Sequence, residues 1–147
     1  MTPDPNTDRK AWMAVLAKAS PSRLAALLPD LPDHTLLRPA EVGAVMLRGR
    51  AGGTGAAFNL GEMTVTRCSL RLATGEVGHA YVQGRDRTHA LQAAAVDALM
   101  QTAHAPDIRA RILTPLATEA EAARTLRASK AAATKVDFFT LMRGEDA

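Results

Sequence analysis

The chain of 147 residues is 47% hydrophobic and 22% charged, which is enough for one globular domain with a core of its own. Aromatic residues make up only 3%, so we expect the core to consist mainly of Ala, Leu, Val and Met. The single cysteine, Cys68, excludes a disulfide or an all-cysteine metal site within this chain, and the net charge of +3 is too small to indicate a strongly basic protein.

Two short helices are predicted at the start of the chain. Residues 9–19 and 21–28 have apolar side chains at helical spacing, and Ser20 followed by Pro21 is a good pair of N-cap and first-turn residues. Residues 1–8 are expected to be a flexible N-terminus. The opening residues carry acids and prolines where a signal peptide would need an apolar stretch, so no targeting signal is expected. No apolar run approaches the roughly 18 residues of a membrane span, so we expect a soluble, cytoplasmic protein without membrane contact.

Four strands are predicted from residue 34 onward, where the sequence becomes rich in Val, Leu and Thr and is interrupted by Gly or Pro. The Thr-Gly-Glu turn at 74–76 joins the last two strands in a tight hairpin, which makes at least that pair antiparallel. The four strands correspond to residues 34–38, 41–50, 61–75 and 76–84.

Helical periodicity returns after the strands. Asp86 or Thr88 caps a helix over residues 89–101, whose leucines and alanines share one face and can cover the sheet. Thr114 and the following proline begin another helix, which is rich in alanine up to about Ala133.

The tail KVDFFTLMRG, residues 135–144, returns to β-type residues and is predicted as a last strand or an extended arm. The predicted fold class is therefore α+β, a single domain in which an antiparallel sheet of about four or five strands has helices before and after it.

The positive charge is concentrated in the middle of the chain. Residues 38–87 contain seven arginines against four acids, whereas residues 1–37 and 88–147 are each balanced. Arginine binds phosphate or carboxylate through its planar fork of N–H donors. The same arginines can also be solvated side chains of the sheet or members of local ion pairs.

The segment RGRAGGTGAAFNLGE, residues 48–62, has five glycines and two arginines. It lacks the lysine of a P-loop, has Phe58 where a dinucleotide fingerprint needs its third glycine, and leads into strand-like residues instead of a helix. Its glycines permit positive φ or close backbone contact, and long connections of this kind are usually functional. The candidate residues for binding substrate or a partner are Arg48, Arg50, Gly52, Gly53, Thr54, Gly55, Asn59 and Glu62.

No catalytic or metal-binding motif is found in the sequence. The four histidines form no HExxH pattern, the serines lie in no GxSxG elbow, and Cys68 is expected to be a packed, inert thiol. Glu62 and Glu76 are a conceivable acid and base, although nothing in the sequence brings them together. No catalytic residue is therefore assigned, and no metal or cofactor is expected in this chain.

Nucleic acid is a partner that the basic pI of about 9.5 suggests, but the basic strands lack the interleaved aromatic residues that stack bases. A stand-alone module that binds anions or nucleic acid through the arginine-rich centre is kept as the alternative function.

Several blocks of the sequence resemble the PhnG family, the G subunit of the bacterial carbon–phosphorus lyase system. They are EVGAVMLRGRAGGTGAAFNLG, continuing as EMTVTRCSLRL and GHAYVQGRDRTHA, together with the tail AAATKVDFFTLMRGE and the opening RKAWMAVLAKA. The resemblance runs from about Arg9 to Glu145, with residues 103–129 similar only in length and texture. It implies a single PhnG-like domain over residues 9–147.

The resemblance implies a subunit of a transferase complex in phosphonate catabolism. In that family the core complex contains the G, H, I and J subunits in two copies each, and the L protein joins for the synthase step. The G, H, I and L proteins displace adenine from MgATP with methylphosphonate and form ribose 1-methylphosphonate 5-triphosphate, so MgATP is a substrate of the assembled complex. Phe138 and Phe139 of the tail are interface candidates, because apolar arms usually dock on another chain.

Overall fold

The computed structural model describes the backbone of residues 4–145 and the side chains of residues 4–135. By their internal contacts these residues form two compact units, one extending to Leu116 and the other beginning at Ala117. Each unit is described by itself below.

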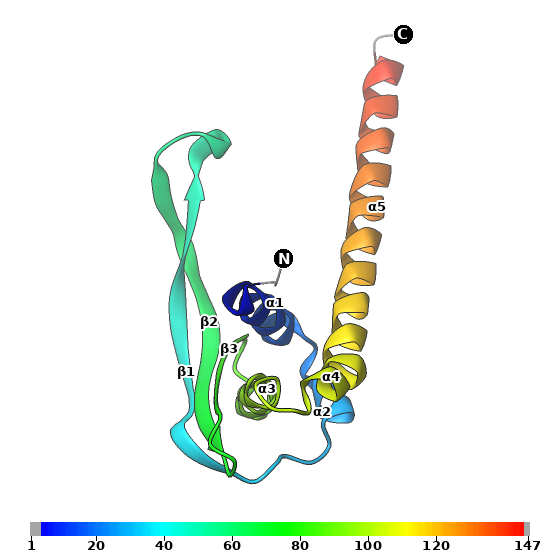
Figure 1. The fold of residues 1–147 in the computed structure, drawn as a ribbon. Coiled ribbons are helices and arrows are strands. Elements are labelled where there is room, and N and C mark those ends of the chain that lie inside the picture. Colours follow the sequence, from blue (N-terminus) through cyan, green and yellow to red (C-terminus); the bar gives the residue numbers. More distant parts are fainter. Residues whose placement is uncertain (1–3, 146–147) are drawn as a thin grey trace. The chain divides into compact units, whose positions relative to one another are not determined.

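The first unit is a three-stranded antiparallel sheet in the order β1-β2-β3. Its helices cover one face of the sheet and leave the other face open, as Figure 1 shows. In chain order the elements of the whole chain are α1 (Pro5–Lys18), α2 (Pro21–Leu27), β1 (His34–Arg50), the 3₁₀ turn η1 (Ala51–Gly53), β2 (Ala57–Leu72), β3 (Val77–Gln83), α3 (Arg87–Leu99), α4 (Ala105–Ile108), the π-helical turn η2 (Arg109–Leu113) and α5 (Thr114–Glu145). From Ala117 onward, α5 forms the second unit.

The helix boundaries follow from local capping. Ser20 and Pro21 begin α2 as predicted, and the Asp86 carboxylate, not Thr88, caps α3 by accepting a hydrogen bond from the His89 backbone N–H at 3.0 Å. Helix α1 begins earlier than predicted, at Pro5, because the Asp4 side chain accepts from the backbone N–H of the second helical residue at 2.9 Å.

The α+β class is confirmed, but the predicted strand count is wrong. The segments predicted as separate strands, 34–38 and 41–50, form the single strand β1. Pro39 cannot donate to the ladder, and β1 absorbs it with register shifts between Leu36 and Arg38 and between Arg38 and Glu41. The sheet therefore has three strands instead of four or five.

The prediction of a strand or arm at residues 135–144 is also wrong, because this segment is the end of helix α5. No glycine or proline occurs between Pro115 and Gly144, and the preceding residues are rich in alanine, so helix propagation meets no break. The side chains of Phe138 and Phe139 lie outside the described residues, so their proposed contact with another chain stays a prediction.

The core lies between the sheet and α3. Alternate residues of β2, Cys68, Leu70 and Leu72, are buried together with Ala80 and Val82 of β3. Helix α3 approaches the sheet so closely that a Cβ on Gly78 would collide with the Ala94 carbonyl oxygen. The small side chains of α3 make this approach possible, which accounts for a core nearly free of aromatic residues.

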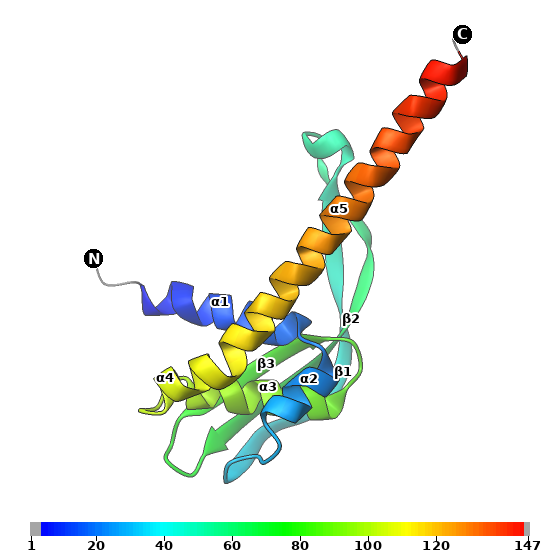
Figure 2. The same ribbon diagram turned by 90° about the vertical axis from the view of Figure 1, so that its right-hand side faces the viewer.

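Helices α1 and α3 lie against the sheet, as the ribbon of Figure 2 shows, and one buried carboxylate joins them to it. Asp97 of α3 is fully buried and accepts hydrogen bonds from Arg9 Nε at 3.1 Å, Arg9 Nη2 at 2.8 Å and Trp12 Nε1 at 2.8 Å, all from α1. It also accepts from the His79 backbone N–H of β3 at 2.9 Å. The hydrogen bond to Asp97 raises the pKa of the Arg9 guanidinium above its ordinary value. The buried Asp97 carboxylate is tolerated in the interior because both of its oxygens accept hydrogen bonds.

Asp97→Ala should lower the free energy of unfolding by about 3–5 kcal/mol, because it leaves Trp12, His79 and Arg9 with unmet donors. Urea denaturation followed by circular dichroism measures the change. Asp107→Ala is the matched control, since its ion pair with Arg111 is exposed and should contribute about 0.5 kcal/mol or less. Equal losses in the two variants would show that Asp97 has no special structural role.

Candidate functional site

The candidate residues lie where β1 and β2 extend beyond the third strand. Strand β3 pairs with β2 only from Val65 to Arg71, whereas the pairing of β1 with β2 continues to Arg50 and Ala57. The two strands rise from the rest of the first unit, at the left of Figure 1. We call residues 44–50 and 57–64 the ribbon, and residues 51–56 its tip.

The tip is built by its glycines, as predicted. Gly52 and Gly53 have φ of 63° and 80°, in the left-handed region that favours glycine, and belong to the turn η1, which has Thr54 as its C-cap residue. The Gly55 backbone N–H donates to the Ala51 carbonyl oxygen at 2.9 Å, and a Cβ on Gly55 would lie 2.8 Å from that same oxygen. The connection is shorter than expected, because most of residues 48–62 belong to the two strands.

The structure brings Arg48, Arg50 and Asn59 to neighbouring positions of the ribbon. Arg48 lies opposite Asn59 and Arg50 lies opposite Ala57, so the two arginines lie on the same side of β1, as predicted. Both are exposed, and within the described residues neither forms an ion pair. They present free guanidinium groups that can bind phosphate or carboxylate oxygens.

Glu62 lies opposite Met46 on the ribbon, whereas Glu76 lies in the turn between β2 and β3 at the other end of β2. The structure therefore does not bring this conceivable acid and base together.

The ribbon also exposes large apolar side chains that sequence reasoning missed. Met46, Leu47, Phe58 and Leu60 are 53%, 41%, 46% and 62% exposed. Leu60 packs across Gly49, where a Cβ would lie 2.7 Å from its Cδ1 atom. Two adjacent apolar residues in a strand, such as Met46 and Leu47, point to opposite faces and cannot both enter one core. The adjacent apolar residues Met46 and Leu47 were the signal in the sequence that one face of this strand exposes apolar side chains.

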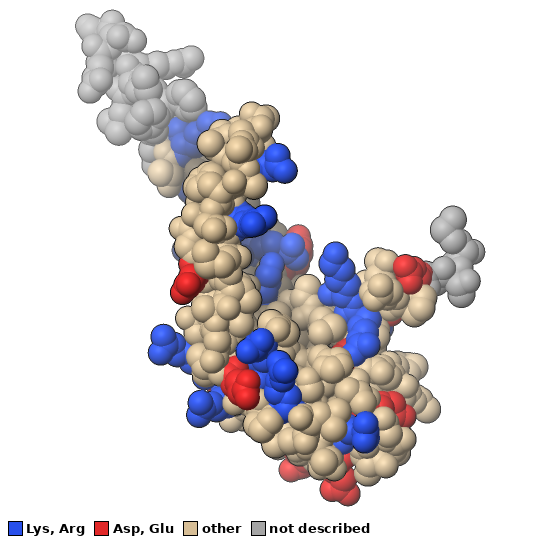
Figure 3. Space-filling view, turned by 90° about the vertical axis from the view of Figure 1, so that its left-hand side faces the viewer, with Lys and Arg blue, Asp and Glu red and all other residues tan. Residues whose placement is uncertain are grey.

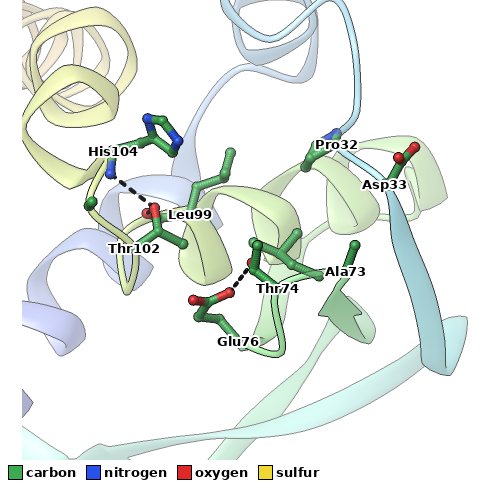
Figure 4. A pocket seen from close by; sticks show the side chains of 10 residues that line it. Pro32, Asp33, Ala73, Thr74, Glu76, Leu99, Thr102 and His104 are labelled. Atoms are coloured by element: carbon green, nitrogen blue, oxygen red, sulfur yellow. Dashed lines mark hydrogen bonds between the residues drawn. The ribbon is translucent and has the colours of Figure 1, made fainter.

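A cavity of about 450 Å³ lies at the other end of the sheet, beside the turn between β2 and β3 (Figure 4). Its apolar lining includes Leu72 and Leu99, and its polar groups are largely bonded to one another. The His104 backbone N–H donates to Thr102 Oγ1 at 3.1 Å, and the Thr74 hydroxyl donates to the Glu76 carboxylate, which lowers the pKa of Glu76. None of the predicted binding residues lines this cavity.

Other chemistry is sparse in the described part of the chain. No group of three His, Cys, Asp or Glu side chains among these residues could hold a metal ion. Cys68 is buried as expected, and burial raises the pKa of its thiol, so the reactive thiolate is disfavoured. No helix among the described residues is long and apolar enough to cross a membrane.

Gly53→Val and Gly55→Val should distort the tip at a local cost of roughly 1–2 kcal/mol, from positive φ in the first case and from contact with Ala51 in the second. Because the tip is exposed and distant from the core, the global melting temperature should stay unchanged while amide exchange at the tip accelerates. Ala56→Val, which adds the same side chain at a residue without positive φ, is the control. A large drop in melting temperature would mean that the tip supports the core.

Comparison with known proteins identifies the family. The family model described as "Phosphonate metabolism protein PhnG" matches residues 7–144. The chain is also 43% identical over 142 residues to a protein of Rhizobium meliloti (strain 1021) named alpha-D-ribose 1-methylphosphonate 5-triphosphate synthase subunit PhnG, and the alignment covers 94% of this chain and 90% of that relative. The chain therefore belongs to the PhnG family of phosphonate metabolism proteins.

Proposed function

We propose that this chain is a subunit of a ribose 1-methylphosphonate 5-triphosphate synthase, in which it supports the displacement of adenine from MgATP by methylphosphonate. The name of the Rhizobium relative supports the product and the subunit status. The companions would be the H, I and J subunits, in two copies each, with the L protein for the synthase step, in the cytoplasm. The observation that supports the subunit role best is the ribbon. There β1 and β2 continue as a pair beyond the point where β3 stops pairing with β2.

A two-stranded ribbon is marginally stable in water without a third strand or a packed face. This ribbon nevertheless exposes Met46, Leu47, Phe58 and Leu60, and such side chains gain stability by docking on another chain. Arg48 and Arg50 lie near the tip, on the face of the ribbon opposite Gly49 and its partner Phe58. Exposed apolar side chains in the same element as unpaired arginines are a composition typical of protein interfaces.

The second unit supports the same role. Every residue of α5 from 118 to 135 is exposed, including Leu126 at 57%. Isolated helices gain little stability from propensity alone, so a solvated helix of this length is best accounted for by a partner surface. Phe138 and Phe139 at its far end are proposed to take part in that contact.

The proposed contribution to catalysis is to complete the complex and its active site, with no cofactor of this chain's own. Arg48, Arg50, Gly52 and Gly53 are exposed, and this segment has neither the lysine nor the following helix that a phosphate cradle requires. MgATP would therefore bind the assembled complex, where Arg48 and Arg50 can reach a triphosphate or a carboxylate of a companion subunit.

Replacing Arg48 and Arg50 together by lysine keeps the charge and removes the planar fork, so synthase activity of the reconstituted complex should fall about tenfold or more. Adenine release from MgATP and methylphosphonate measures it. The double replacement Arg85→Lys and Arg87→Lys, outside the ribbon, should leave the rate unchanged. Full activity in the Arg48/Arg50 variant would exclude bidentate recognition by these two residues.

Calorimetry of the lone chain with MgATP separates the subunit role from the alternative of a stand-alone anion-binding module. We expect no binding by the lone chain, together with consumption of MgATP by the complex. Micromolar binding by the lone chain would contradict the proposal and favour the stand-alone module.

A further inference from the structure

The face of the sheet opposite the helices carries an ordered set of polar side chains. The strand register places Arg38, Ser69 and His79 in one row across the sheet, and Glu41, Arg67 and Tyr81 in the next. Arg71 lies in the preceding row. We call this surface the outer face, and define it as Arg38, Glu41, Arg67, Ser69, Arg71, His79 and Tyr81.

The centre of the outer face is held in place by contacts within the sheet. The Arg67 guanidinium lies over the Tyr81 ring, 5.9 Å from its centroid, and Arg67 Nη1 donates to the Tyr81 hydroxyl at 3.4 Å. The Ser69 hydroxyl and His79 Nδ1 share a hydrogen bond of 2.8 Å. These side chains are pre-ordered, so a partner that binds them loses less conformational entropy.

The charge of the outer face is unbalanced. It has three arginines and one acid, Glu41, whose charge acts on Arg67. Arg38 and Arg71 are exposed, and no carboxylate of the described residues pairs with either. Figure 3, which looks from the side of the sheet that the helices leave open, shows basic side chains distributed along this surface.

We propose that the outer face docks on an acidic surface of a companion subunit, with Arg38 and Arg71 pairing to carboxylates and Tyr81 packing at the centre. Arginine and tyrosine are the residue types that contribute most at protein interfaces, and unpaired guanidinium groups on a rigid sheet match carboxylates in charge and geometry. Tyr81 is the chain's one tyrosine and is 51% exposed. The inference depends on the proposed function for the identity of the partner.

Nucleic acid fits this surface less well. Tyr81 is the single aromatic residue of the outer face, and the Arg67 guanidinium already covers its ring, so no base can stack on that side. The outer face contains no lysine and includes Glu41, which would repel a phosphate backbone.

The test is competition between two copies of the chain inside one cell. Wild-type chain and the variant Arg38→Glu/Arg71→Glu are co-expressed with the companion subunits, and the complex is captured through a tag on one companion. Intact-mass analysis then gives the ratio of variant to wild type in the complex. We expect the variant to be depleted about tenfold or more, because reversed charges repel an acidic partner. Lys10→Glu/Arg87→Glu changes the net charge equally away from the outer face and should enter at parity.

Incorporation of Arg38→Glu/Arg71→Glu at parity would overturn the inference. The milder variant Arg38→Gln/Arg71→Gln should be depleted less than the glutamate variant, at an unchanged melting temperature. Equal depletion of the two variants together with lower melting temperatures would assign the effect to folding, and this result would also overturn the inference. If the variant enters at parity but loses binding to a labelled oligonucleotide, the face belongs to nucleic acid. Failure to capture even the wild-type chain would contradict the proposed function instead.

Discussion

The fold depends on one buried carboxylate. Asp97 gives α3 a direct connection to α1 through Arg9 and Trp12, and to β3 through the His79 backbone. Most buried side chains of α3 are alanine and do little to fix its position, whereas four hydrogen bonds to Asp97 orient α3 relative to α1 and β3. The hydrogen bond from the His79 backbone N–H to Asp97 also occupies a donor of β3 with which a further strand could otherwise pair.

This arrangement separates stability from recognition. The half of β2 that pairs with β3 faces α3 and builds the core, while the other half pairs only with β1 and its residues 57–62 are exposed. The ribbon therefore contributes little to the core and is free to vary in chemistry. Its apolar side chains, its two exposed arginines and its glycine tip support the proposed role of the ribbon in assembly.

Local signals in the sequence predicted much of the fold. The start of α2 at Ser20 and Pro21, the cap Asp86 and the glycines of the tip could be predicted because each signal acts within a few residues. The continuity of β1 through Pro39 could not, since a bulge that absorbs a proline depends on the partner strand. The role of Asp97 was equally hidden, because Arg9 and Asp97 lie 88 positions apart. For the candidate site, the common side of Arg48 and Arg50 was predicted, and their role in binding stays a prediction. The exposed apolar side chains of the ribbon were missed, because their exposure depends on where β3 ends.

Hydrogen exchange can test whether the ribbon takes part in assembly. Amide exchange is measured by mass spectrometry over residues 44–64, in the chain alone and in the complex reconstituted with its companion subunits. We expect fast exchange in the lone chain and at least about tenfold slower exchange in the complex, with the amides of α3 protected in both. Equally fast exchange of the ribbon in the fully assembled complex would show that it makes no stable contact with a companion subunit.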